Sequence, residues 1–220
     1  MENIELIVFD LDGTLVRSHK TIYLATIKAF EDLGIQDKLD EDEFYNMIGM
    51  HFQDIFDEFE IHVNDFDHFI EVYKYHYNIL MNTSELYPDV AETLNHLKKK
   101  EYKIALLTTK GQDQAEKIIS HFNLDSYFDE IHGRRPELPI KPNPEPLLLI
   151  CNNLKVKPEN TLMVGDSELD VNCAHNAKTK SCAAAYGYRT KERLQTEQPD
   201  IVIDSINELL TVINKNGESK

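Results

Sequence analysis

Two hydrophobic periodicities divide this chain. From residue 87 onward, short β-rich apolar runs alternate with amphipathic segments whose apolar positions recur every three or four residues. Strands that are buried on both faces and separated by helices are typical of a parallel, doubly wound, Rossmann-like α/β sheet. The pattern predicts strands over residues 103–107, 128–131, 161–164, 181–184 and 201–202, and helices over residues 89–100, 112–121, 144–153, 167–177 and 205–213.

Residues 18–82 show only the helical period. This stretch contains twelve of the twenty Phe and Tyr residues although it is under a third of the chain, so it could build a small core of its own. We therefore predict an inserted all-helical cap domain at residues 18–82, and an α/β core made of residues 1–17 and 83–220. In the last predicted helix of the cap, one face carries Phe66, Phe69, Ile70, Tyr73, Tyr77 and Leu80.

Length, charge and cysteine usage exclude several classes of function. The 220 residues suit one domain with a modest insertion. A formal net charge of −16 disfavours nucleic acid or an anionic membrane surface as a partner, because both bind clustered Lys and Arg. No apolar run approaches the roughly 18 residues of a membrane span, and three cysteines without a CxxC motif are typical of reduced intracellular thiols. We expect a cytoplasmic protein that is a monomer or a weak homodimer.

The first chemical signal directly follows the first strand. An apolar run at residues 7–9 leads into Asp10, Asp12 and the turn-forming Gly13. Two carboxylates one residue apart at the end of a strand can bind a small divalent cation. The alternative interpretation is an acidic turn without a ligand, and the rest of the chain has to decide between the two.

A second acidic motif follows the strand predicted at residues 161–164. If a helix begins at Ser167, Asp166 caps it and Asp170 faces the same side, so that both carboxylates can reach one metal. The alternative is a helix cap followed by a solvated acid. Together with Asp10 and Asp12, these groups would carry up to four negative charges, which repel one another unless a dication neutralises them. Mg²⁺ suits such an all-oxygen site and leaves positions for water and a phosphate group.

Hydroxyl and cationic side chains follow two further elements. Thr108, Thr109 and Lys110 come after the strand predicted at residues 103–107, where a hydroxyl can donate to a phosphate oxygen or simply cap the next helix. Lys141 lies on a Pro-flanked loop before a helix. Beside an acidic metal site, a fixed Lys can restrain a nucleophilic carboxylate and offset phosphate charge, whereas elsewhere it would be an ordinary surface residue.

Taken together, these motifs resemble those of the haloacid dehalogenase superfamily of phosphatases with an inserted helical cap. Asp10-Leu11-Asp12-Gly13-Thr14-Leu15 is similar to the first motif, Thr108 to the second, Lys141 to the third and residues 165–170 to the fourth. The order, spacing and strand context of the motifs agree from residue 4 to about residue 190. Among the subgroups, phosphoglycolate phosphatases look most similar in layout.

The resemblance implies a role for each matched residue. Asp10 would attack phosphorus and become an aspartyl phosphate, while Asp12 would give a proton to the leaving alcohol and later take one from water. Thr108 and Lys141 would hold the phosphoryl group. The implied ligands of Mg²⁺ are Asp10, the backbone carbonyl of Asp12, and Asp166, with Asp170 assisting through water or from behind.

The substrate would be a small phosphorylated metabolite. In such family members one cap loop reaches the substrate, and by position this loop contains Gly49, Met50 and His51, which we expect to act together with Thr109. A plain helix–helix turn is the alternative. Arg134 and Arg135 either contact an anionic substrate tail or lie on the surface.

Two rival functions stay open at this point. A sugar phosphomutase of the same superfamily carries a His at the hinge, where this chain has Ile22, and a cap-loop Arg that this chain lacks. In a different class, a non-catalytic phospho-acceptor or binding protein could use the same acids, Mg²⁺, Thr and Lys without turnover.

Overall fold

The computed structural model describes residues 1 and 3–213. The strands in this part of the chain are β1 (Leu6–Phe9), β2 (Val16–Arg17), β3 (Glu85–Leu86), β4 (Lys103–Gly111), β5 (Glu130–Arg134), β6 (Thr161–Gly165), β7 (Lys180–Ala184) and β8 (Ile201–Ile203). Six of them form one parallel sheet in the order β5-β4-β1-β6-β7-β8. From β1 the chain first builds one side of the sheet and then crosses to the other, so the strand order reverses between β1 and β6. Ligands bind at such a switch point in open α/β sheets.

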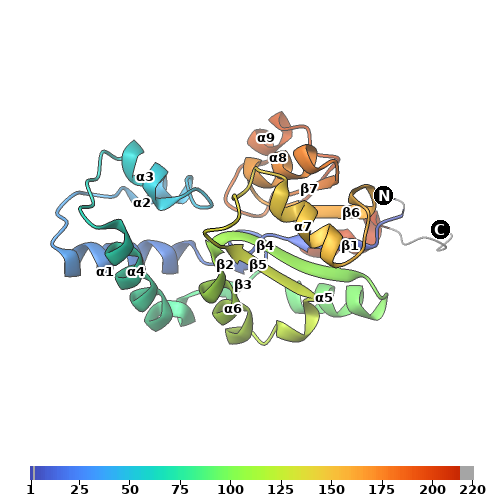
Figure 1. The fold of residues 1–220 in the computed structure, drawn as a ribbon, viewed down its shortest axis with the longest axis horizontal. Coiled ribbons are helices and arrows are strands. Elements are labelled where there is room, and N and C mark those ends of the chain that lie inside the picture. Colours follow the sequence, from blue (N-terminus) through green and yellow to red (C-terminus); the bar gives the residue numbers. More distant parts are fainter. Residues whose placement is uncertain (2, 214–220) are drawn as a thin grey trace.

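Helices cover both faces of the sheet (Figure 1). Residues of α5 and α6 pack on one face, and residues of α7 and α8 on the other. The α-helices are α1 (His19–Leu33), α2 (Glu41–Tyr45), α3 (Phe52–Glu58), α4 (Phe66–Leu80), α5 (Val90–Lys99), α6 (Gln112–His121), α7 (Glu145–Asn153), α8 (Glu168–Ala177), α9 (Lys191–Thr196) and α10 (Leu209–Val212), and the short 3₁₀ helices are η1 (Met81–Thr83), η2 (Asp125–Tyr127), η3 (Pro158–Asn160) and η4 (Ile206–Glu208).

The central strand shows why the sheet is parallel and covered on both sides. All four residues of β1 are buried, and neighbouring side chains belong to opposite apolar layers. Leu6 and Val8 pack into the layer that contains residues of α7 and α8, whereas Ile7 and Phe9 pack into the layer that contains residues of α5 and α6. The predicted doubly wound α/β fold is confirmed.

Helices α1 to α4 project from the sheet as a separate helical region (Figure 1). The chain enters this region through β2 and leaves it through β3, and these two strands pair antiparallel, with Val16 opposite Leu86. Aromatic rings fill the space between the helices: the ring centroids of Phe56 and Phe69 are 5.0 Å apart. This cluster continues into the apolar layer that contains residues of α5 and α6. The residue limits of 18 and 82 for a cap domain stay a prediction.

Several element boundaries differ from those predicted. β4 continues to Gly111, four residues beyond its predicted end, and β5 begins and ends later than expected. The helix predicted at residues 205–213 is divided between η4 and α10, while α9, β2 and β3 were not predicted at all. In the described part of the chain, no helix combines the length and apolar character needed to cross a membrane.

Candidate active site

Three buried carboxylates meet where β1 and β6 end. Asp10 directly follows β1, Asp166 directly follows β6, and Asp170 lies in the first turn of α8. Because β1 and β6 are neighbours in the sheet, their carboxyl ends lie side by side. One carboxylate oxygen from each of the three residues lies within 4.8 Å of the other two, and none of the three is more than 7% exposed.

Lys141 joins two of these acids. Its Nζ atom lies 2.7 Å from Oδ1 of Asp10 and 2.6 Å from Oδ1 of Asp170, and its side chain is buried. The second oxygen of Asp170 accepts hydrogen bonds from the backbone N–H of Ser167 at 3.0 Å and from its hydroxyl at 2.6 Å. Burial alone would lower the pKa of Lys141, but Asp10 and then Asp170 together raise it above its usual range. The Lys141 cation is therefore fixed in place against Asp10.

The helix start at this site differs from the prediction in one respect. Ser167, not Asp166, is the N-cap of α8, and the helix begins at Glu168. Asp170 is thus the third residue of the helix and bonds back to the cap, as in a capping box. Asp166 is released from capping, which leaves its carboxylate directed toward Asp10 and Asp170.

The backbone contacts Asp166 closely at two glycines, Gly13 and Gly187. Its Oδ2 atom accepts from the backbone N–H of Tyr188 at 2.7 Å. A Cβ atom on Gly13 would lie 2.2 Å from Oδ2 of Asp166, and one on Gly187 would lie 2.2 Å from its Cβ. Gly13 also has a φ of +86°, which favours glycine. Only glycine fits at these two positions.

The charges of this cluster fit a small divalent cation. Burial raises the pKa of Asp10 to about 7, with Lys141 opposing the shift and Asp170 adding to it. Burial, followed by repulsion from Asp10, also holds the pKa of Asp166 well above its usual value. Three ionised carboxylates with one ammonium would leave excess negative charge in a buried volume, which is costly. An all-oxygen donor set of this kind suits a hard dication.

Asp12 lies apart from the three clustered carboxylates. Its carboxylate accepts from the Ser18 hydroxyl and forms an ion pair of 3.1 Å with Nζ of Lys110. The Lys110 ammonium in turn lies 4.5 Å from the centroid of the Tyr77 ring. The structure therefore brings together three of the four predicted carboxylates and gives the fourth a different set of partners. The backbone carbonyl of Asp12 as a metal ligand stays a prediction.

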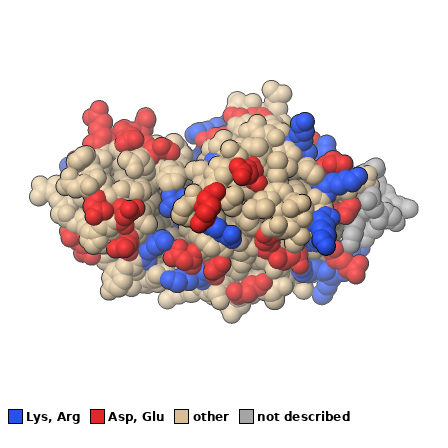
Figure 2. All heavy atoms as spheres, in the orientation of Figure 1, with Lys and Arg blue, Asp and Glu red and all other residues tan. Residues whose placement is uncertain are grey.

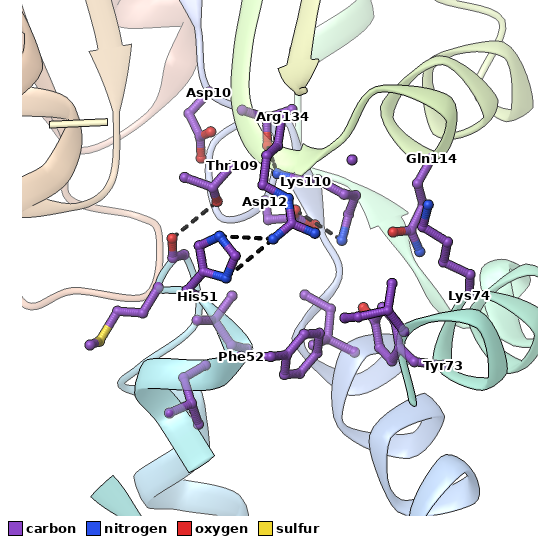
Figure 3. Close-up of a pocket in the computed structure, with 18 of the residues that line it drawn as sticks. Asp10, Asp12, His51, Phe52, Tyr73, Lys74, Thr109, Lys110, Gln114 and Arg134 are labelled. Atoms are coloured by element: carbon purple, nitrogen blue, oxygen red, sulfur yellow. Dashed lines mark hydrogen bonds and ion pairs between the residues drawn. The ribbon is translucent and has the colours of Figure 1, made fainter. Parts of the chain in front are cut away.

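A cavity of about 80 Å³ separates the sheet from the helical region (Figure 3). The residues predicted to form the site that line it are Asp10, Asp12, Gly49, Met50, His51, Thr108 and Thr109. They are joined by Arg134, for which the sequence left a substrate contact and a surface position open, and by residues not predicted for the site, among them Phe52, Tyr73, Lys74, Lys110 and Gln114. Lys141, Asp166 and Asp170 lie behind Asp10 and do not line this cavity. Apart from Lys141, Asp166 and Asp170, then, the predicted residues face one cavity.

The loop that carries Gly49, Met50 and His51 is held to the core by three side chains. The Thr109 hydroxyl donates to the Gly49 carbonyl at 3.0 Å, and Nη2 of Arg189 donates to the Ile48 carbonyl at 3.0 Å. Nη1 of Arg134 lies 2.8 Å from Nε2 of His51. This loop is therefore more than a turn between two helices, because it closes one wall of the cavity.

A bulge in β4 explains why Lys110 faces the cavity. Leu107 pairs with His132 and Gly111 pairs with Arg134. Between these two pairs β4 advances by four residues while β5 advances by two. Extra residues in one strand bend it and redirect its side chains. Within the bulge, Thr108 accepts from the Lys110 backbone N–H at 3.2 Å. The sequence signal that could have identified Lys110 was its place directly after the two threonines.

Known proteins are similar to this chain over most of its length. A family model described as haloacid dehalogenase-like hydrolase matches residues 7–184. A phosphoglycolate phosphatase from Aquifex aeolicus (strain VF5) is 32% identical over 212 residues, covering 95% of this chain and 96% of that protein. Pyrophosphatase PpaX from Bacillus mycoides (strain KBAB4) is 31% identical over 219 residues, covering 96% and 98%. The crystal structure of a predicted phosphoglycolate phosphatase from Haemophilus somnus is 29% identical, covers 95% of this chain and 97% of that chain, and superposes with a TM-score of 0.81.

Proposed function

Because this chain belongs to the haloacid dehalogenase-like hydrolase family and is a phosphatase, we propose that it hydrolyses a small phosphorylated metabolite with Mg²⁺, through an aspartyl phosphate. The observation that carries this proposal is the contact of Asp10 with Lys141 beside Asp166 at the end of the central strand. A buried ammonium holds the Asp10 carboxylate in one orientation, and Asp10 also faces the cavity in which a substrate would lie.

Asp10 and Asp12 divide the chemistry between them. A carboxylate oxygen of Asp10 attacks phosphorus, and the bond from phosphorus to the leaving oxygen breaks as the acyl phosphate forms. Asp12 gives a proton to that leaving oxygen, then takes a proton from the water that attacks the acyl phosphate and releases inorganic phosphate. Both residues line the cavity, which supports their acting on one substrate. Asp10 is regenerated at the end of the cycle.

The remaining residues of the site bind and orient. Asp10, Asp166 and the backbone carbonyl of Asp12 would hold Mg²⁺, which supplies positive charge beside the transferring phosphoryl group. Asp170 would orient Lys141 and Ser167, because its two carboxylate oxygens accept hydrogen bonds from these residues. As the resemblance implies, Thr108 and Lys141 would bind the phosphoryl oxygens: Thr108 lines the cavity, and Lys141 contacts Asp10, which lines it.

The relatives indicate which substrates to test first. Two of the similar proteins are named for phosphoglycolate and for pyrophosphate, and we propose both compounds as candidate substrates of this chain. The cavity of about 80 Å³ is consistent with a small substrate. A cytoplasmic location and a monomer or weak homodimer stay predictions.

The test is an assay of purified protein with Mg²⁺ against phosphoglycolate, pyrophosphate, sugar phosphates and nucleotides. We expect hydrolysis of at least one compound, and we expect Asp10→Asn to lower kcat by more than about 10³-fold, because loss of a nucleophile removes the covalent route. Asp204→Asn is a matched control, since Asp204 pairs with Lys191 at the surface. Full activity of Asp10→Asn would exclude the mechanism, and a stable phosphoprotein without turnover would favour a phospho-acceptor.

A further inference from the structure

Arg134 is a half-buried cation that lacks a carboxylate partner. It is the last residue of β5, and its guanidinium lines the same cavity as Asp10 and Asp12 (Figure 3). Among the residues that the structure describes, none offers it a carboxylate within ion-pair distance; its contact is with the ring of His51. A guanidinium removed from water without an opposite charge is costly, so an anionic partner is expected.

The other cations around the cavity already have such partners. Lys110 pairs with Asp12 at 3.1 Å, and Lys74 pairs with Asp113 at 2.8 Å. Each of these ammonium groups has a carboxylate partner within the protein itself. In the described part of the cavity wall, Arg134 is therefore the cation that has no carboxylate partner.

His51 supports Arg134 without neutralising it. Burial, and then the nearby Arg134, lower the pKa of the His51 ring, which favours the neutral ring, and a ring nitrogen accepts a hydrogen bond from Arg134. This contact occupies Nη1 of Arg134. The guanidinium has five N–H donors in a planar fork that matches the oxygens of a carboxylate or a phosphate. The remaining donors can bind such a group while His51 holds the fork in position.

The neighbouring arginine is arranged differently. Nε and Nη2 of Arg135 both donate to Oε1 of Gln112, at 3.2 and 3.1 Å, and Arg135 does not line the cavity. The sequence offered two adjacent arginines as candidates for an anionic substrate tail, and the fold directs only Arg134 toward Asp10. Figure 2 shows further Lys and Arg side chains along the boundary between the helical region and the sheet, where a groove lined by Lys74 and Arg134 adjoins the cavity.

We propose that Arg134 binds a second anionic group of the substrate, and that it selects phosphate compounds that carry a carboxylate or a second phosphate near the scissile bond. This inference rests on the proposed phosphatase function. Asp10 and Arg134 then contact opposite ends of one small substrate. His51 is a positioning residue, because it acts through the Arg134 guanidinium.

The experiment compares three substrates under Mg²⁺. 2-Phosphoglycolate carries a carboxylate and pyrophosphate carries a second phosphate, whereas 2-hydroxyethyl phosphate has the same skeleton as phosphoglycolate with a neutral hydroxymethyl group. For Arg134→Gln we expect kcat/KM to fall about 10- to 100-fold for whichever anionic substrate the wild type uses, mainly through KM. The fall for 2-hydroxyethyl phosphate should be at least ten times smaller. Arg134→Lys keeps the charge but loses the planar fork of donors. Its kcat/KM for the anionic substrate should lie between the values of the wild type and of Arg134→Gln.

Matched controls separate this inference from its alternatives. Arg135→Gln removes the same charge one residue away and should change each kcat/KM by less than about 3-fold, and thermal unfolding checks that every variant is folded. An equal fall for all three substrates in Arg134→Gln would mean that Arg134 only holds the cap loop, and the inference would be wrong. A wild type that prefers the neutral ester would also overturn it. A wild type that hydrolyses no phosphate compound would instead refute the proposed function.

Discussion

At the scale of single residues, glycines shape this site as much as the acids do. Gly187 was not predicted to contribute, yet its backbone lies so close to Asp166 that a Cβ atom would collide with it at 2.2 Å. Asp166 also accepts a hydrogen bond from the backbone N–H of Tyr188, the residue after Gly187. The segment around Gly187 therefore fixes the orientation of a candidate metal ligand.

Gly187→Ala should damage metal binding. The added methyl group must displace Asp166 or the backbone, and such overpacking typically costs about 1 to 3 kcal/mol of stability. We expect kcat/KM to fall by more than about 10-fold, with a smaller rise in Tm on adding Mg²⁺. Gly34→Ala is the control: Gly34 has a φ of +68° but open space around it, so Ala should cost stability without changing the response to Mg²⁺. Equal Mg²⁺ responses in the two variants would contradict this explanation.

Some residues of the site can be identified from the local sequence and others cannot. Asp10, Asp12, Asp166 and Lys141 could be selected because each stands at a strand end or on a rigid loop within a motif. Nothing in the local sequence distinguishes Arg134 from its neighbour, because only the register of β5 against the bulged β4 decides which arginine faces the cavity.

At the scale of elements, α4 was predicted more accurately than the short segments. Apolar residues at steps of three and four predict one buried face of this helix. Phe69, Tyr73 and Tyr77 on that face are buried. Element α9 has six residues and buries only Leu194, so it carries too little periodicity to predict. The β2–β3 pair joins segments on either side of the helical region, and a contact between distant segments is not visible in a local pattern.

Phe69→Ala should strongly destabilise the helical region. The Phe69 side chain is fully buried among aromatic rings, and truncation of a core Phe costs about 3 to 5 kcal/mol. On the same helix, Tyr75 is 62% exposed, so Tyr75→Ala should change stability by less than about 0.5 kcal/mol. Urea unfolding measures both values. Similar losses in the two variants would show that α4 does not pack as described.

At the scale of the whole molecule, proton and metal binding compete at the acidic cluster. Burial raises the pKa of Asp10 from an ordinary value of 3.8 to about 7, and raises that of Asp166 as well. Without a cation, the folded protein thus holds protons that the unfolded chain has already lost. The stability that these groups contribute is present at low pH and is lost as the pH rises through about 7. A cation requires the ionised forms, so its effect has the opposite sign.

Stabilisation by Mg²⁺ should therefore increase with pH. Saturating Mg²⁺ at about 100 times its Kd contributes about 2.7 kcal/mol, which corresponds to a rise in Tm of roughly 5 to 10 °C for a chain of this size at pH 8. At pH 6 the rise should be clearly smaller. Thermal melts with Mg²⁺ or with a chelator at both pH values measure this, and Asp166→Asn should remove most of the rise at pH 8. A larger rise at pH 6 would contradict the description of the cluster.

The alternation of strands and helices, the helical insertion and the acids that follow β1 and β6 could all be predicted from the sequence. These are local properties, because the hydrophobic period and the end of a strand each depend on a short stretch of neighbouring residues. Only the folded chain shows that Asp12 lies apart from the other carboxylates and pairs with Lys110, and that Arg134 faces the cavity with no carboxylate partner among the described residues. The physical reason is that both depend on strand register and on the packing of distant segments, which place side chains within a few ångströms of each other irrespective of their separation along the chain.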